Sequence, residues 1–415
     1  MKRRGSRSRR LKNSMQIVLP FGPGGIVRNK EKRHPPPPLP SGDWVLLTTV
    51  VVLCLFGLLM VYNASSIRAE RTYLDSFYFI KKQIQWSLVG VAAFAAASRF
   101  DADRLRDWMV PIAVLVMMAL ASALIFGKDI NGSRRWISLG PISLQPSEIA
   151  KLFTVFYLSH YIAKKGERLR NFLDGAAPPL IVIGLMIFLI LLEPDLGTTV
   201  VILCLSSALL FLGGVPLKQM AMLSGMLVPV FLYWAVSAPY RLKRLLTFLN
   251  PWKDPYGSGF QIIQSHIALG SGGLAGKGLT EGKQIMFFLP EPYTDFIFAV
   301  IGETFGLVGT TLILSLFAVI LWRGTRIALK TESPFSRMMA SGMTLLIVLP
   351  ALLNMAVVTA LLPTTGLPLP FLSYGGSAML INCTAVGVLY NISRQVQDRT
   401  FGYATKGNSI WEGLQ

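Results

Sequence analysis

The chain of 415 residues is 52% hydrophobic and only 15% charged, and its formal net charge is +19. This composition excludes an ordinary soluble protein, because the apolar residues come in blocks of about 20, the length that a helix needs to cross a bilayer. A transmembrane β-barrel is excluded too, since runs such as Val50 to Leu53 lack the alternation of barrel strands. The sequence therefore predicts an all-α polytopic membrane protein.

The chain starts with a basic arm over residues 1–40. Residues 1–34 hold eleven Lys or Arg and a single acid, Glu31, and four prolines follow at 35–38. Such an arm can bind nucleic acid, but ahead of a first span it more often marks the cytoplasmic side and contacts anionic lipid headgroups. We expect a disordered cytoplasmic arm and no nucleic-acid partner.

Ten apolar blocks follow and predict about ten transmembrane helices in one bundle over residues 41–395. They lie near residues 44–64, 82–98, 108–126, 148–164, 177–192, 196–213, 217–237, 295–322, 338–361 and 375–392. The short loops at 164–176 and 322–337 are rich in Lys and Arg, so both termini are expected to be cytoplasmic, with a tail over 396–415. The large loop between spans seven and eight is then extracytoplasmic.

The segment after the third block contains candidate binding and structural residues. Arg134 and Trp136 lie in a polar run from 131 to 140, where Trp136 is either an interface anchor or a stacking surface beside a phosphate-binding guanidinium. Glu148 and Lys151 stand three residues apart on one helix face. Glu148 could only cap the helix dipole, but we favour a structural or functional charge pair facing the bundle interior.

The large loop between spans seven and eight holds further polar residues. Arg241 and Arg244 lie near its start, and Gln264 and Ser265 lie in a predicted amphipathic helix over 260–270, placed in the membrane interface. The glycine-rich run 270–278 fits neither a P-loop nor a dinucleotide-binding unit. Either its amides and Lys277 approach an anionic group, or it is a flexible hinge.

Asp295 stands where this loop meets the eighth apolar block, after Glu291. A carboxylate at the bilayer interface can stay ionised while it reaches the polar end of a lipid-anchored substrate; the alternative is a helix cap. Glu303 lies deeper in the same block, which indicates a polar bundle interior. The Pro- and Gly-rich run 363–377 predicts a re-entrant loop that walls the same cavity.

These segments, which together span residues 44–395, resemble the SEDS family (shape, elongation, division and sporulation proteins). The resemblance rests on runs at 131–137, 145–148, 240–244, 264–278, 289–298 and 363–377. The Leu-Pro-Thr-Thr-Gly motif at 362–366 and the basic arm favour the FtsW-like division branch over the RodA-like elongation branch. The family also leads us to expect His where Tyr293 stands and an apolar residue where His266 stands.

The resemblance implies a peptidoglycan glycosyltransferase that polymerises lipid II at the septum, in the bacterial cytoplasmic membrane. It implies Asp295 as the essential carboxylate, which we expect to act as general base. It also implies a divalent cation, Mg or Mn, without an organic cofactor. The implied partners are a class B penicillin-binding transpeptidase (FtsI-like) and other divisome membrane proteins. A lipid II flippase, a RodA-like elongation polymerase and a non-catalytic scaffold remain as alternatives.

The expected substrate contacts follow from the chemistry of lipid II. Positive side chains are needed to stabilise the pyrophosphate leaving group, for which we expect Arg134, Arg241, Arg244 and Lys277. Trp136, Gln264, Ser265 and Glu291 complete the expected substrate-binding set. The scattered histidines and cysteines show no metal-ligand spacing, so the residues that would hold a cation are not identified by the sequence.

Overall fold

The structure is a computed structural model that describes residues 42–130, 133–140, 142–222, 225, 239–257, 259–279, 282 and 289–412. The basic arm lies outside these residues. Within them, nine of the ten predicted spans coincide with a helix, whereas the block at 217–237 falls mostly outside the described ranges. The nine helices are α1 (Trp44–Tyr73), α2 (Tyr78–Ala97), α3 (Met109–Phe126), α4 (Pro146–Lys165), α5 (Ala177–Leu192), α6 (Leu196–Leu212), α11 (Ile297–Lys330), α12 (Pro334–Val358) and α13 (Gly376–Glu412).

Shorter elements connect these helices. Helices α8 (Pro239–Leu249) and α9 (Phe260–Gly272) lie in the large loop, so the helix predicted over 260–270 is confirmed. Instead of lying free of the bundle, α9 packs on α11 and buries Ile263 and Ala268. Four short helical turns complete the set: Ala102–Trp108, Gly166–Arg170, Phe172–Ala176 and Pro251–Lys253.

Length and composition support a membrane bundle. In the part of the chain that the structure describes, six helical segments are long and apolar enough to cross a bilayer: Trp44–Tyr73, Ala102–Phe126, Phe172–Leu192, Ile297–Lys330, Pro334–Val358 and Gly376–Gln397. Helix α6 is apolar but shorter, while α2 and α4 each carry two charged residues in their first half and are not among the six. The chain is a multi-pass membrane protein, and the predicted all-α class is confirmed.

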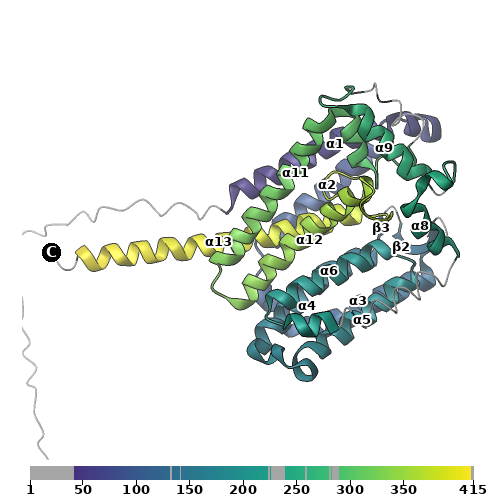
Figure 1. Cartoon of the computed structure of the whole chain (residues 1–415). Helices are drawn as coiled ribbons and strands as arrows, with labels where there is room; N and C mark the ends of the chain where they lie inside the picture. The colour runs from purple at the N-terminus through teal and green to yellow at the C-terminus, as the bar shows by residue number, and fades with distance from the viewer. Residues whose placement is uncertain are drawn as a thin grey trace, which may run out of the picture. The chain divides into compact units, whose positions relative to one another are not determined.

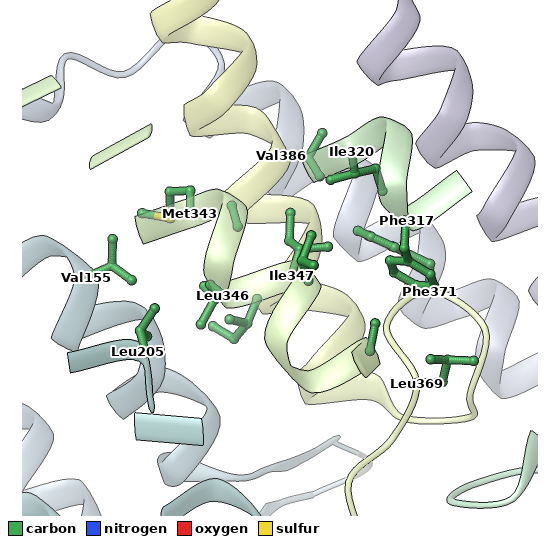
Figure 2. Close-up of a cluster of buried hydrophobic side chains, with 14 of the residues drawn as sticks. Val155, Leu205, Phe317, Ile320, Met343, Leu346, Ile347, Leu369, Phe371 and Val386 are labelled. Carbon is green, nitrogen blue, oxygen red and sulfur yellow. The ribbon is translucent and has the colours of Figure 1, made fainter. Parts of the chain in front are cut away.

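Helix α12 forms the centre of the bundle. It contacts α4 and α6 on one side and α11 and α13 on the other (Figure 1). Apolar side chains from all five helices meet there, as Figure 2 shows for Val155, Leu205, Phe317, Ile320, Met343, Leu346, Ile347 and Val386. Lipid tails are as apolar as these side chains, so the helices associate through close packing more than through exclusion of water.

A three-stranded antiparallel sheet stands where the sequence predicted only a polar segment. Its strands are β1 (Lys128–Ile130), β2 (Ser133–Leu139) and β3 (Ile142–Leu144), in the order β1-β2-β3. Alternating apolar residues in β2 and β3 pair Ile137 with Leu144 across the ladder. The sheet lies beside the turn before α11 and the loop before α13, and we call this part of the molecule the sheet end.

Helix α11 is broken at Gly306, where φ is 63° and ψ is −154°. The glycine-rich run 273–278 fills the break, because its backbone pairs with the groups that the helix leaves open. Four hydrogen bonds form this seam: Lys277 N to Glu303 O (2.9 Å), Gly278 N to Thr304 O (3.0 Å), Leu307 N to Gly273 O (2.9 Å) and Val308 N to Leu274 O (3.2 Å). Backbone groups at membrane depth need such partners.

The seam explains the glycines of this run in a way that the sequence analysis did not foresee. A Cβ at Gly276 would lie 2.1 Å from Thr304 O, and a Cβ at Gly306 would lie 2.5 Å from Gly276 N. The amides of Lys277 and Gly278, for which an anionic ligand was one of two alternatives, donate instead to helix carbonyls. The run therefore approaches another backbone.

The charged pair of α4 is buried inside the bundle. Lys151 Nζ lies 2.8 Å from Glu148 Oε1, and the two residues are 5% and 3% exposed. Removal of one partner would leave a lone buried charge, which is far more costly than the loss of the attraction itself.

We therefore expect Glu148→Ala and Lys151→Ala each to destabilise the protein by about 3–5 kcal/mol. The double variant should lose less than the sum of the two, because the residues share one interaction. Thermal unfolding of the purified protein in detergent measures this, with the exposed Glu167→Ala as control. Strictly additive losses would show that the pair contributes no coupling energy.

Candidate active site

A cavity of about 310 Å³ opens at the sheet end. Six separate segments contribute to its wall: strand β2, the turn before α6, α9, the turn before α11, α12 and the loop before α13. The lining residues are Ser133, Arg135, Trp136, Pro194, Leu196, Gln261, Glu291, Asp295, Phe296, Asn354, Val357, Thr364, Thr365, Gly366 and Leu367. The prediction that the loop at 363–377 walls the same cavity as Asp295 is confirmed.

Asp295 lies in the turn that precedes α11. The helix begins at Ile297, and its N-cap position is held by Phe296, which makes no side-chain capping bond. Asp295 therefore precedes the N-cap position rather than occupying it. Its carboxylate lies beside the loop before α13, since a Cβ added to Gly366 would lie 3.5 Å from Asp295 Oδ2.

The turn before α11 and the loop before α13 are joined through their backbones. Ser373 Oγ donates to Thr294 O and accepts from Leu369 N, and Tyr374 N donates to Tyr293 O at 2.8 Å. From the other side, the buried amide of Asn354 in α12 donates to Asp295 O at 2.7 Å and to Leu367 O at 2.6 Å. The position of Asp295 is thus set by two elements distant in sequence, the loop before α13 and α12.

An aromatic cluster supports the same turn. The ring centroid of Tyr293 lies 4.5 Å from that of Phe79 and 5.9 Å from that of Tyr374, and the Phe79 and Tyr374 rings are 5.3 Å apart. Burial and a hydrogen bond with Glu291 raise the pKa of Tyr293, so its hydroxyl stays protonated. The Tyr that stands where His was expected therefore has a packing role here.

Glu291 lies at the rim of the cavity and pairs with Arg68 of α1. The distance from Arg68 Nη2 to Glu291 Oε1 is 3.0 Å, and both side chains are more than two-fifths exposed. An exposed pair of this kind contributes little to stability, but it orients the Glu291 carboxylate at the rim.

A β-bulge decides which arginine reaches the cavity. Lys128 pairs with Trp136 and Asp129 pairs with Arg134, so Arg135 is an extra residue without a partner on β1. Bulges interrupt the regular alternation of side chains and re-aim them. As a result Arg135 and Trp136 both line the cavity, whereas Arg134, which the sequence analysis selected, is exposed and outside the lining.

Arg135 is fixed by the turn between α5 and α6. It donates from Nε to Glu193 O at 2.9 Å and from Nη2 to Pro194 O, and its Nη1 lies 3.8 Å from Asp195 Oδ1. The buried Asp195 carboxylate also accepts from Gln145 Nε2 at 3.0 Å and from Thr198 Oγ1 at 2.9 Å. This network holds a guanidinium at the cavity wall.

Glu193 is the unusual member of that turn. It is 1% exposed, and neither carboxyl oxygen has a hydrogen-bond partner among the described residues. Burial and the neighbouring Asp195 raise the pKa of Glu193 to about 8, against the opposing effect of Arg135. Glu193 therefore holds its proton at neutral pH.

The remaining predicted residues lie around this site in different ways. Ser265 is fully buried and donates to Ile262 O and Val358 O, so it joins α9 to α12 rather than lining the cavity. Gln264 is half-buried beside it, one turn from the cavity-lining Gln261. Both belong to the helix that closes one wall.

The basic residues of the large loop are not brought to the cavity wall in the described part of the structure. Lys277 Nζ lies 3.7 Å from Oε1 of the fully buried Glu303, which shows that the lysine faces a buried carboxylate of α11. Arg241 and Arg244 belong to α8, and their side chains lie outside the described residues.

Sequence reasoning missed Arg135 and Asn354. A bulge leaves no mark in the spacing of residues, so nothing distinguished Arg135 from its neighbour. Asn354 did carry a signal, because an amide in the apolar block at 338–361 is costly unless it has a local function.

Within the described ranges, no group of three His, Cys, Asp or Glu side chains gathers as a metal site would require. The oxygen groups that face the cavity are instead the carboxylates of Asp295 and Glu291 and a few amides and hydroxyls.

The fold and this cavity define a class of multi-pass membrane proteins with carboxylates in the lining of a cavity at one end of the bundle. Comparison with known families identifies it: a model of the FtsW, RodA and SpoVE family, described as cell cycle proteins, matches residues 43–398. The chain belongs to this family.

Several curated relatives are similar over most of their length. "Probable peptidoglycan glycosyltransferase FtsW" of Geobacter metallireducens is 40% identical over 86% of this chain and 95% of its own. The protein of the same name in Trichlorobacter lovleyi is 43% identical over 85% of this chain and 93% of its own. "Stage V sporulation protein E" of Bacillus subtilis is 42% identical over 85% of this chain and 97% of its own.

Solved structures share the fold. A chain from "Structural coordination of polymerization and crosslinking by a peptidoglycan synthase complex" aligns with a TM-score of 0.70 at 28% identity, covering 86% of this chain and 98% of that one. The rod shape determining protein RodA of Thermus thermophilus aligns with a TM-score of 0.64 at 25% identity, covering 85% and 97%.

The raised pKa of Glu193 predicts a pH-dependent stability. Between pH 4.5, the ordinary value, and about 8 the folded protein keeps a proton that the unfolded chain releases, so stability falls as pH rises through this window. Glu193→Gln removes this loss. The variant should match the wild type below the window and exceed it by a margin that grows with pH up to about 8.

Thermal unfolding in detergent across this pH range tests the prediction, with the exposed Glu167→Gln as matched control. If the wild type and Glu193→Gln curves run parallel at every pH, Glu193 does not titrate differently in the folded state.

Proposed function

We propose that this protein is a peptidoglycan glycosyltransferase that polymerises lipid II during septal cell-wall synthesis. The observation that carries the proposal is the placement of Asp295 in the lining of the cavity at the sheet end, beside Gly366 and with Arg135 and Trp136 in the same lining. The names of relatives at about 40% identity support the same activity.

The reaction joins two substrate molecules across this cavity. The 4-hydroxyl of a GlcNAc attacks the anomeric carbon of a lipid-linked MurNAc, the new C–O bond forms, and the bond from that carbon to the pyrophosphate breaks. Undecaprenyl pyrophosphate leaves with the electron pair, and the hydroxyl proton passes to a base. Asp295 is the base, because a half-buried carboxylate in a turn at the cavity wall can accept it.

Positive charge is needed on the leaving-group side. Arg135 supplies it from a fixed position, since its contacts with the backbone of the 193–195 turn leave the guanidinium at the wall. Trp136 beside it offers a ring face for sugar packing. Of the basic residues expected from sequence, Arg241 and Arg244 stay candidates for contacts with the pyrophosphate. Lys277 faces Glu303 instead.

The protein offers a divalent cation two carboxylates at this site. Mg²⁺ uses one or two carboxylates and otherwise keeps water and substrate phosphate oxygens as ligands, so Asp295 and Glu291 would suffice from the protein. Such a cation would neutralise the charge that develops on the pyrophosphate.

The orientation follows from the charge of the short loops. Lys and Arg in the loops at 164–176 and 322–337, at the bundle end opposite the sheet, favour the cytoplasm. The sheet end then faces the extracytoplasmic side, where septal peptidoglycan is assembled.

Asp295→Asn tests the base. The substitution keeps the size and removes the charge, so polymerisation of fluorescent lipid II by the purified protein should fall by roughly 10²–10⁴-fold. Membrane insertion and thermal unfolding should stay normal. Asp174→Asn, at an exposed turn remote from the cavity, is the control. Near-normal glycan chains from Asp295→Asn would remove Asp295 from this role.

A cross-linking partner completes the proposed function. Within the described residues there is no folded soluble domain that could act as a transpeptidase, and a structural relative belongs to a peptidoglycan synthase complex. We expect a single-span class B penicillin-binding protein to bind at the sheet end and to raise polymerase activity.

Deletion of residues 1–40 should leave that stimulation intact, because the positive charge of the arm leads us to expect it on the cytoplasmic side. The measurement is glycan polymer formed by the full and the truncated chain, each with and without the partner. Equal activity with and without the partner, or loss of stimulation on truncation, would contradict activation at the sheet end.

A further inference from the structure

Asn354, a residue of the cavity lining, has a buried polar atom without a hydrogen-bond partner among the described residues. The residue is 2% exposed and lines the cavity together with Asp295. Its amide nitrogen has both hydrogens engaged, by Asp295 O at 2.7 Å and Leu367 O at 2.6 Å. Its Oδ1 is buried and has no hydrogen-bond partner among the described residues.

The orientation of the amide follows from these bonds. Two carbonyl oxygens accept from the side chain, so the nitrogen must face them and the oxygen must face the other way. Both hydrogen bonds from the amide nitrogen are short. A flipped amide would be unfavourable, because its oxygen would then face the two carbonyl oxygens. An acceptor is therefore fixed in place beside the residue that we assign as base.

A second atom of the same kind belongs to another residue of the cavity lining. Thr365 Oγ1 is also buried, also without a partner among the described residues, and also in the lining. A buried acceptor without a partner costs about 1–3 kcal/mol, and two on the walls of one cavity are accounted for by a ligand that donates hydrogen bonds to both.

We propose that Asn354 binds the sugar that reacts at Asp295: its Oδ1 accepts a hydrogen bond from a hydroxyl or acetamido N–H of that sugar, while its NH₂ group holds the Asp295 turn against the loop at 364–367. One side chain then fixes both the base and the substrate group next to it. This inference rests on the proposed function, because the ligand class is taken from it.

Two variants separate the halves of this role. Asn354→Asp keeps an acceptor oxygen but loses both amide N–H donors, so the Asp295 turn is released. We expect kcat to fall at least tenfold, while KM for lipid II stays within about twofold of the wild-type value. Asn354→Leu loses donors and acceptor, so kcat should fall and KM should rise about fivefold to tenfold, the effect of one lost hydrogen bond. Leu352→Ala, exposed on the same helix, is the matched control.

A binding measurement keeps the test independent of turnover. In the Asp295→Asn background, direct binding of fluorescent lipid II should weaken about fivefold to tenfold on addition of Asn354→Leu and stay nearly unchanged on addition of Asn354→Asp. Thermal unfolding of each variant shows whether it is folded. Titration of Mn²⁺ in the polymerisation assay should give the same half-saturating concentration for the wild type and Asn354→Asp.

The outcomes are distinct from those for the proposed function. Equal lipid II binding by folded Asn354→Leu and its parent, while the wild type polymerises normally, overturns the assignment of Asn354 alone. A shift in the Mn²⁺ requirement without a change in lipid II binding overturns it as well, because Oδ1 would then be a cation ligand. Absence of polymerisation by the wild type would instead contradict the proposed function.

Discussion

The structure depends on one constraint, that backbone groups away from water must be paired within the protein. Two irregular segments show the effect of this constraint: the run at 273–278 and the loop before α13. Each finds its partners in another element: the first in the gap of α11 at Gly306, the second in the turn that carries Asp295. The irregular segments are therefore the parts that fix how the helices meet at the sheet end.

The same constraint places the chemistry. An unsupported turn would leave its side chains mobile, whereas Asp295 is held through its own carbonyl and through those of Thr294 and Tyr293. These contacts fix the backbone of the turn, and Asp295 lines the cavity. Binding energy can then be directed to the reacting atoms, because the protein does not have to reorganise around them.

Much of this could be predicted from the sequence, for identifiable reasons. The length of an apolar block predicts a membrane-spanning helix, and nine helices in the described ranges coincide with predicted blocks. A carboxylate and a proline-rich loop at the same membrane boundary had to lie near each other, and both line the cavity. The three-residue spacing of Glu148 and Lys151 placed them on one helix face, where they pair.

The rest depends on contacts that spacing does not encode. Arg135 replaces Arg134 because of a bulge in the register between β1 and β2. The glycine-rich run looked like an anion-binding loop because close backbone approach requires the same residues whether the partner is a phosphate or a helix. At Gly276 and Gly306 the atom that blocks a side chain is itself backbone, so no substitution elsewhere can make room. Sequences that keep this fold are thus confined to glycine at both sites, while lipid-facing positions are free to drift among apolar residues.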